Sequence, residues 1–310
     1  MLKIVFMGTP LFSVPILEAL INEYEVIGVV TQPDKKVGRK QELMASPVKE
    51  CALKHNIPVF QPIKIRTDYE DIAALKPDLI VTAAYGQIVG MKLLNTPKYR
   101  SINVHASLLP KYRGGAPIHE AIKQGESETG VTIMYMEKGM DSGDILAQKK
   151  IPITDEDNSG TMFEKLSLLG RDLLLEVIPK LVNGEIEPIK QDETKVTFAY
   201  NVTKEEEKLD FTKSARTVFN HIRAYNPFPT AYMELGGDIV KVYDSKINDE
   251  THNKTPGTIL KTTKHGFLMA CGNGTTLEIL EVQPSGKKRM KASDYANGAI
   301  RKYLKKEKER

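Results

Sequence analysis

The chain has 310 residues, of which 41% are hydrophobic and 27% charged, so it is long enough for about two domains with buried cores. No run approaches the roughly 20 apolar residues of a membrane span, and the N-terminus lacks a signal-peptide pattern, so we expect a cytoplasmic protein without a membrane partner. The two cysteines, Cys51 and Cys271, stand far apart without metal-ligand spacing, which argues against a disulfide framework and a zinc site.

The net charge of +4 is distributed unevenly along the chain. Residues 207–310 contain 19 Lys and Arg against 12 Asp and Glu, whereas residues 1–206 contain 25 against 28. A basic C-terminal third suggests a polyanionic partner, although a solvated Lys-rich surface is almost as compatible with the charge alone.

Strand and helix patterns alternate through the first part of the chain, which predicts an α/β fold with a parallel sheet and helical crossovers. The strand patterns cover residues 2–8, 25–31, 78–86 and 100–106. The helix patterns cover residues 15–24, 46–56 and 71–77. Residues 130–137 and 145–153 predict a strand pair at the sheet edge, and residues 159–184 predict a long helix that packs across the sheet.

The composition changes at residues 190–206, which are polar and charged without a sustained period. We therefore expect a linker there, between one domain at residues 1–189 and a second at residues 207–310. In the second domain, a helix pattern at residues 214–225 precedes short strand candidates with turn signals between them, which predicts a small β-barrel. These candidates cover residues 231–235, 239–247, 257–263, 266–272 and 276–284.

Asn103 and His105 stand two residues apart on a predicted strand, so their side chains project to the same side. In open parallel sheets, ligands bind beyond the carboxyl ends of the strands, where this pair would lie. For an isolated pair, the more common explanation is an Asn that begins a turn and a His that bonds a backbone carbonyl. The loop that follows, residues 107–118, is rich in Gly and Pro and favours a ligand-binding role.

Asp141 and Asp144 lie in a Gly-punctuated loop between the two predicted edge strands. No His or Cys cluster accompanies them, so a metal site is not implied. Taken alone, these aspartates would fit a solvated β-turn equally well.

Together, "NVHASLLPKYRGGAPI" and "MDSGDI", with "AAYGQIV" upstream, resemble the formyltransferase family that uses 10-formyltetrahydrofolate. "KIVFMGTPLFSVPIL", "TQPDKKVGRK", "IRAYNPFPTAY", "PGTIL" and "GKKRM" resemble the methionyl-tRNA formyltransferases within that family, over nearly the whole chain. The resemblance implies a Rossmann-like formyltransferase domain followed by an OB-like β-barrel that binds tRNA. The chain departs from the family's usual residues at Leu11, Gly90, Ala106 and Phe228.

The resemblance assigns catalysis to Asn103, His105 and Asp141. Formyl transfer to an amine passes through a tetrahedral intermediate, and the Asn103 amide and the His105 imidazole suit its oxyanion as donors. Asp141 would orient His105 or keep it protonated, and through water it would relay a proton from the attacking amine to the leaving nitrogen. The sequence leaves these roles of Asp141 open.

The resemblance also implies binding residues for the donor and for the tRNA, with no metal. Those for the folate donor are Leu108, Leu109, Pro110, Lys111, Tyr85, Gly86, Gln87, Ile88 and Val89. Those for the tRNA, with Lys204 added from the linker, are Phe12, Lys36, Arg39, Lys40, Lys204, Lys287, Lys288 and Arg289. Phe12 would line the pocket of the methionine side chain, with core packing as the more common alternative.

The sequence thus predicts a monomeric enzyme that transfers a formyl group from 10-formyltetrahydrofolate to the α-amine of initiator Met-tRNA. One alternative keeps the three catalytic residues but formylates a small amine, such as glycinamide ribonucleotide or an amino-sugar nucleotide. The basic C-terminal third argues against it, because a small metabolite needs no such surface. A second alternative is a folate-responsive RNA-binding protein without catalysis, which would not require the three residues.

Overall fold

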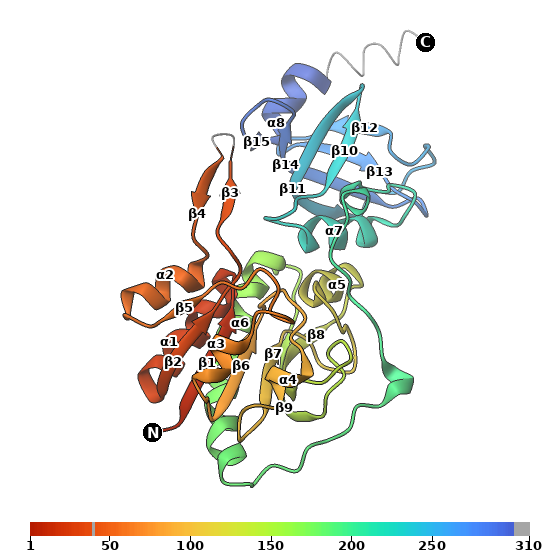
Figure 1. Cartoon of the computed structure of the whole chain (residues 1–310). Helices are drawn as coiled ribbons and strands as arrows, with labels where there is room; N and C mark the ends of the chain where they lie inside the picture. The colour runs from red at the N-terminus through yellow and green to blue at the C-terminus, as the bar shows by residue number, and fades with distance from the viewer. Residues whose placement is uncertain (39–40, 301–310) are drawn as a thin grey trace. The chain divides into compact units, whose positions relative to one another are not determined.

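The computed structural model describes residues 1–38 and 41–300, which form two compact units that interleave along the chain (Figure 1). The first unit holds Met1–Pro117, Glu128–Pro152 and Phe163–Tyr200. The second unit holds Ile118–Ser127, Ile153–Met162 and the residues from Asn201 onward.

A seven-stranded sheet organises the first unit. Its strands are β1 (Lys3–Gly8), β2 (Glu25–Val30), β5 (Val59–Phe60), β6 (Leu79–Ala83), β7 (Ser101–His105), β8 (Glu128–Tyr135) and β9 (Ile145–Pro152). The strand order is β5-β2-β1-β6-β7-β8-β9, parallel from β5 to β7, with β8 and β9 antiparallel at one edge. The predicted, mostly parallel sheet with an antiparallel edge pair is confirmed.

The central strands are buried on both faces because their sequences are almost continuously apolar, as parallel sheets require. All of β6 is buried, and so is all of β1 after its first residue. The helices of this unit are α1 (Val14–Glu23), α2 (Pro47–Lys54), α3 (Glu70–Ala74), α4 (Met91–Leu94) and α6 (Ser159–Val182), which begins in the second unit. At the start of α2, the Ser46 side chain accepts a hydrogen bond from the Lys49 amide, and Pro47 takes the first helical position.

The sequence patterns missed the shortest elements. The hairpin of β3 (Lys35–Val37) and β4 (Glu42–Met44) exposes Lys35, Lys36 and the whole of β4, including the apolar Leu43 and Met44. Its short strands show no alternation of apolar and polar side chains. Strand β5 and helix α4 are too short to show a period. Arg39 and Lys40, which the resemblance assigns to tRNA contact, lie outside the described residues.

The second unit combines helices with an antiparallel half-barrel sheet, which confirms the small C-terminal β domain. Its strands are β10 (Tyr232–Leu235), β11 (Asp238–Asn248), β12 (Ile259–Thr262), β13 (Phe267–Ala270), β14 (Thr276–Pro284) and β15 (Met290–Lys291). Their order is β10-β11-β14-β13-β12, with β15 paired to β14. The helices are α5 (Pro117–Lys123), α7 (Ala215–Ala224) and α8 (Ala292–Tyr295).

Short helical turns complete the two units. The turns cover Leu11–Ser13, Glu193–Lys195, Glu205–Glu207 and Ala296–Ile300.

A buried arginine explains why residues 153–162 belong to the second unit. Arg223 of α7 donates hydrogen bonds to the carbonyls of Thr154 and Asp157 and to the side chain of Asn220. Because a buried guanidinium must keep its acceptors, these bonds hold residues 153–162 within the second unit.

No helix in the part of the chain that the structure describes is both long and apolar enough to cross a membrane. Cys51 and Cys271 are both buried, as small apolar side chains commonly are.

Replacing Gly90 with proline is expected to stabilise the first unit. Gly90 precedes α4 with φ −75°, which proline adopts, and a Cβ there would meet no atom closer than 3.9 Å. Loss of unfolded-state entropy should contribute about 0.4–1 kcal/mol and raise the thermal midpoint by roughly 1–3 °C. Gly86→Pro is the matched control, because Gly86 has φ 88° and its replacement should lower the midpoint. A lower midpoint for Gly90→Pro would contradict the argument.

Candidate active site

Asn103 and His105 lie together near the carboxyl end of β7, the strand between β6 and β8. In the sheet register, Asn103 is paired with Thr82 of β6, and His105 with Thr132 of β8. The i and i+2 spacing places both side chains on the same side of the sheet. The loops that follow β6 and β7 leave at this end of the sheet. Strand β8 runs antiparallel and ends beside the start of β7, and the loop after it brings Asp141 to His105.

The side chain of Thr82 fixes how the Asn103 amide points. Thr82 is 2% exposed, and its hydroxyl donates a hydrogen bond of 2.7 Å to Oδ1 of Asn103. Among the described residues, no acceptor takes a hydrogen bond from Nδ2 of Asn103. The amide therefore keeps its N–H donors for a ligand, which is the arrangement that an oxyanion requires.

Replacing Thr82 with valine should lower kcat roughly 10-fold, because the Asn103 amide loses the bond that orients it. Thr82→Ser retains the hydroxyl and should keep kcat near the wild-type value. Steady-state kinetics with the two substrates would measure both. Equal kcat values for the valine and serine variants would show that Thr82 does not orient Asn103.

His105 is 5% exposed and has protein partners at both ring nitrogens. Its Nε2 lies 3.0 Å from the carbonyl oxygen of Tyr112, and its Nδ1 lies 3.6 Å from Oδ2 of Asp141. Because a carbonyl only accepts hydrogen bonds, Nε2 carries a hydrogen. Donation from Nε2 to a substrate oxygen would require the ring to leave the Tyr112 carbonyl.

Asp141 connects the loop after β8 with the loop after β7. Its Oδ2 accepts a hydrogen bond of 2.9 Å from the Gly114 amide and faces His105. Its backbone has φ 45°, a left-handed conformation that is uncommon for residues other than glycine. The structure thus brings Asp141 and His105 together from positions 36 residues apart, beside Asn103.

The loop after β7, which the resemblance assigns to the folate, is held by polar contacts to β8 and β9. Thr132 accepts a hydrogen bond from the Leu109 amide, and Gln148 donates to the Leu109 carbonyl. Leu109 itself is buried, whereas Leu108 and Pro110 are half-buried and Lys111 is exposed. The backbone of Leu109 is therefore engaged within the protein, and its neighbours offer the accessible surface.

The segment after β6, residues 85–89, is partly core and partly surface. Tyr85 and Val89 pack in the hydrophobic core, and burial raises the pKa of the Tyr85 phenol to about 12. Gly86 turns the chain with φ 88°. Gln87 accepts a hydrogen bond from the Ile65 amide and donates to the side chain of Gln32 and the carbonyl of Pro62.

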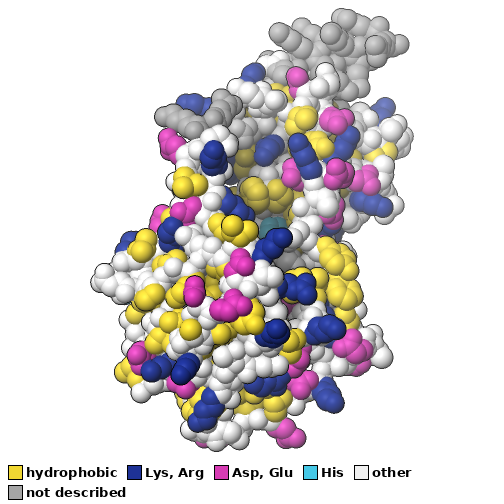
Figure 2. Space-filling model, viewed as in Figure 1, with side chains coloured by type: hydrophobic (Ala, Val, Ile, Leu, Met, Phe, Trp, Pro, Cys, Tyr) yellow, Lys and Arg dark blue, Asp and Glu magenta, His cyan; other side chains and the backbone are white. Residues whose placement is uncertain are grey.

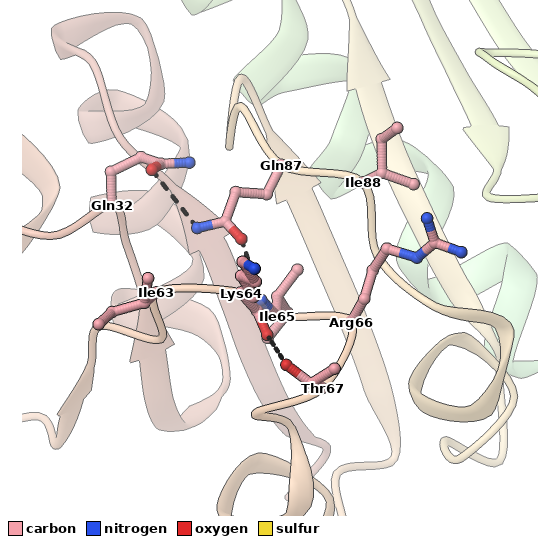
Figure 3. Close-up of a pocket in the computed structure, with 8 residues that line it drawn as sticks. All are labelled: Gln32, Ile63, Lys64, Ile65, Arg66, Thr67, Gln87 and Ile88. Carbon is pink, nitrogen blue, oxygen red and sulfur yellow. Dashed lines mark hydrogen bonds between the residues drawn. The ribbon is translucent and has the colours of Figure 1, made fainter.

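Gln87 and Ile88 line a groove of about 710 Å³ (Figure 3). The other wall comes from residues 63–67, and the Arg66 and Ile88 side chains point to the same side in the close-up. Lys64 and Arg66 make no ion pair with the residues that the structure describes. The groove is therefore positively charged, with exposed apolar side chains at Ile63 and Ile88.

Phe12 is buried in the first unit, where its ring meets the edge of the Phe163 ring at 6.2 Å between centroids. The Ser167 hydroxyl donates to the Phe12 carbonyl. These contacts are those of a residue packed in the core, which is the alternative to methionine binding. A role of Phe12 in methionine binding stays a prediction.

The described basic residues assigned to tRNA are all exposed. Lys36 lies on β3, and Lys204 precedes a helical turn of the second unit. Lys287 and Lys288 lie in the loop between β14 and β15, where Arg289 pairs with Glu281 and lies 4.2 Å from the Tyr243 ring centroid. On the visible face of this unit, Lys and Arg are interspersed with Asp and Glu (Figure 2).

Sequence reasoning missed the residues that support the site. Thr82, Thr132 and Gln148 carry no motif of their own, and only the strand register brings them to β7 and its loop. Within the described residues, no group of three or more His, Cys, Asp and Glu side chains could hold a metal ion.

Two family models match the chain: Formyl transferase over residues 2–178, and Formyl transferase, C-terminal domain, over residues 201–299. The methionyl-tRNA formyltransferase of Bacillus cytotoxicus is 53% identical over 302 residues, which cover 96% of each chain. That of Pediococcus pentosaceus is 54% identical and covers 96% of this chain and 94% of the relative.

Among solved structures, an N-formyltransferase from Helicobacter canadensis, in complex with folinic acid and dTDP-3-aminofucose, matches with a TM-score of 0.71. It is 21% identical and covers 90% of this chain and 99% of its own, so this likeness shows the fold alone. HypX from Aquifex aeolicus in complex with tetrahydrofolic acid matches with a TM-score of 0.63 at 17% identity, covering 94% of this chain and 46% of its own. Given relatives that are more than half identical over nearly their whole length, the chain belongs to the methionyl-tRNA formyltransferase family.

Proposed function

We propose that the protein transfers the formyl group of 10-formyltetrahydrofolate to the α-amino group of methionine on initiator Met-tRNA, for translation initiation. The observation that carries this proposal is the meeting of Asn103, His105 and Asp141 at the carboxyl end of β7. The family supports the reaction type, since its characterising activity is formyl transfer to Met-tRNA.

In this mechanism, Asn103 stabilises the oxyanion. The Nδ2 hydrogens, which Thr82 leaves free by occupying Oδ1, donate to the formyl oxygen as negative charge develops on it. Because the amide is held before the substrates arrive, little reorganisation is needed at the moment of reaction.

His105 and Asp141 act as a pair that handles protons. The Asp141 carboxylate faces Nδ1 and orients the ring, whose Nε2–H can donate to the same formyl oxygen once the ring leaves the Tyr112 carbonyl. Asp141 is only half-buried, so water can reach its carboxylate and carry a proton from the attacking amine to the leaving nitrogen. No covalent enzyme intermediate is needed for this reaction.

A folate donor fits the groove beside residues 85–89. The groove combines apolar side chains at Ile63 and Ile88 with the cations Lys64 and Arg66, which suits an aromatic molecule that carries carboxylates. The accessible residues Leu108 and Pro110 would complete the donor's surroundings. When bound, the donor supplies the activated formyl carbon.

The tRNA would contact basic residues, with Lys287 and Lys288 of the loop between β14 and β15 on its phosphates. We propose that residues 1–189 form the catalytic domain, residues 190–206 a linker and residues 207–310 the tRNA-binding domain. The protein is proposed to work as a cytoplasmic monomer.

The test of this function is transfer from labelled 10-formyltetrahydrofolate to charged initiator Met-tRNA. We expect label on Met-tRNA and none on free methionine, uncharged tRNA, glycinamide ribonucleotide or an amino-sugar nucleotide. Label on one of the small amines, with Met-tRNA unlabelled, would replace this function with small-molecule formylation. Binding of folate and tRNA without transfer would favour the non-catalytic alternative.

A further inference from the structure

Residues 189–199, which we name the strap, run along the loops that carry the catalytic groups. Ile189 begins the strap by exchanging two backbone hydrogen bonds, of 2.7 and 2.9 Å, with Ile145 at the start of β9. Most of the strap belongs to the segment that the sequence predicts as a linker. In the structure it instead bonds to both sides of the candidate site.

The far end of the strap pairs with the loop after β7. The Arg113 amide donates to the Thr197 carbonyl, the Ala199 amide donates to the Arg113 carbonyl, and the Ala116 amide donates to the Ala199 carbonyl. The Thr197 hydroxyl accepts from the Tyr112 amide at 2.9 Å. The contact is close, because a Cβ on Gly114 would lie 2.5 Å from the Ala199 carbonyl oxygen.

Gln191 joins the two catalytic loops through one side-chain amide. It is 9% exposed, and its Nε2 donates hydrogen bonds of 2.8 Å to the carbonyls of Asp141 and Gly143. Its Oε1 accepts from Nε and Nη2 of Arg113, at 3.0 and 2.8 Å. All the hydrogen-bonding capacity of the amide is thus used between the two loops.

Arg113 is 5% exposed, so its charge depends on acceptors within the protein. Besides Gln191, it bonds the Glu193 carboxylate at 2.8 Å, and this hydrogen bond lowers the pKa of Glu193. Both acceptors of the Arg113 side chain therefore come from the strap. The buried guanidinium fixes the loop after β7 to this segment.

The two loops hold the catalytic groups through residues in strained backbone conformations. Tyr112, whose carbonyl meets His105, has φ 63°, and Asp141 has φ 45°. Such conformations persist where the surroundings over-determine them, and they often occur at active sites. The strap bonds both residues: Thr197 holds the Tyr112 amide and Gln191 holds the Asp141 carbonyl.

We infer that Gln191 is a positioning residue for the formyl transfer, which sets Asp141 against His105 by tying the Asp141 loop to Arg113. This inference rests on the proposed function and deepens it. Gln191 acts through Asp141 and does not itself contact the substrates. The first part of the proposed linker is therefore bonded to the loops that carry the catalytic groups.

The test is Gln191→Glu. A carboxylate keeps an acceptor for Arg113, but it puts oxygen against the carbonyls of Asp141 and Gly143, which lose their donor. We expect kcat to fall roughly 10- to 100-fold, as misplaced catalytic groups do, with the KM of both substrates within about 3-fold. Lys195→Ala, on the exposed side of the same strap, is the matched control and should keep the wild-type kcat.

A double-mutant cycle separates positioning from a merely structural role. In an Asp141→Asn background, Gln191→Glu should cost less than about 3-fold in kcat, because the group that it positions is already disabled. The same fold loss in both backgrounds would overturn the inference. A rise in KM with unchanged kcat would overturn it as well.

Hydrogen exchange tests the contact of Gln191 with the two loops independently of activity. In Gln191→Glu, the amides of residues 107–116 and 136–146 should exchange faster than in the wild type, while those of β7 and β8 stay unchanged. Unchanged exchange in both loops would refute the positioning contact. If the wild type transfers no formyl group, the proposed function is refuted. Faster exchange in the Gln191→Glu variant would then still support the contact between Gln191 and the two loops.

Discussion

Replacing His105 with alanine is expected to lower kcat roughly 10³-fold, because the reaction loses both a proton donor and the partner of Asp141. The affinity for tRNA should stay within about 3-fold of the wild type, since His105 is buried and offers little surface to a macromolecule. Single-turnover transfer measures the first quantity, and filter binding of Met-tRNA measures the second.

His55→Ala provides the control, because His55 is exposed at the end of α2. It should change neither quantity. The alanine variant also loses the contact between the ring and the Tyr112 carbonyl, so circular dichroism is needed as a check of its fold. We expect the fold to be retained. Parallel losses of turnover and tRNA affinity in a folded variant would remove His105 from the chemical step.

Reversing the charge at Lys287 and Lys288 should weaken tRNA binding roughly 30-fold at low salt and flatten its salt dependence. Each phosphate contact contributes about 0.7–0.9 to the slope of log affinity against log salt, so two lost contacts should reduce the slope by nearly 2. Arg289 is a weaker choice for this test because Glu281 and the Tyr243 ring already engage its guanidinium. Binding is measured across a salt series with Lys287→Glu/Lys288→Glu.

The matched control is Lys254→Glu/Lys264→Glu, which changes the net charge equally on other exposed loops of the same unit. This variant should keep most of the slope. If both double variants flatten the slope equally, the basic third acts through its net charge and the loop between β14 and β15 has no special role. An unchanged slope in the Lys287 variant would refute the proposed contact.

The long, regular elements were predicted well because their patterns are local. The predicted strands at residues 2–8 and 100–106 correspond to β1 and β7, and the predicted helix at residues 159–184 corresponds to α6. The first strand is a short, almost continuous apolar run, the second alternates polar and apolar residues, and the helix repeats its apolar residues every three to four positions. The β3–β4 hairpin was missed because its strands have three residues each and the apolar Leu43 and Met44 stand next to each other, so no alternation marks them.

The candidate site was predictable to the extent that it lies within short motifs. Asn103 and His105 share a face by strand alternation alone, whereas the pairing of Asp141 with His105 came from family resemblance. The tertiary structure then placed the Asp141 carboxylate 3.6 Å from His105. It also bonded both His105 and Asp141 to the loop of Tyr112 and Gly114.

The sequence by itself determined the α/β architecture and the small β domain, and with the family resemblance it supplied the proposed reacting side chains. Only the tertiary structure decided which residues support them: Thr82 on Asn103, and Gln191 on the loops of Asp141 and Arg113. Gln191 lies 50 and 78 residues from these two partners. Local periodicity reports which side of an element is buried, but it contains no information about which distant amide meets which carbonyl. Those contacts follow from how the completed sheet brings its loops together.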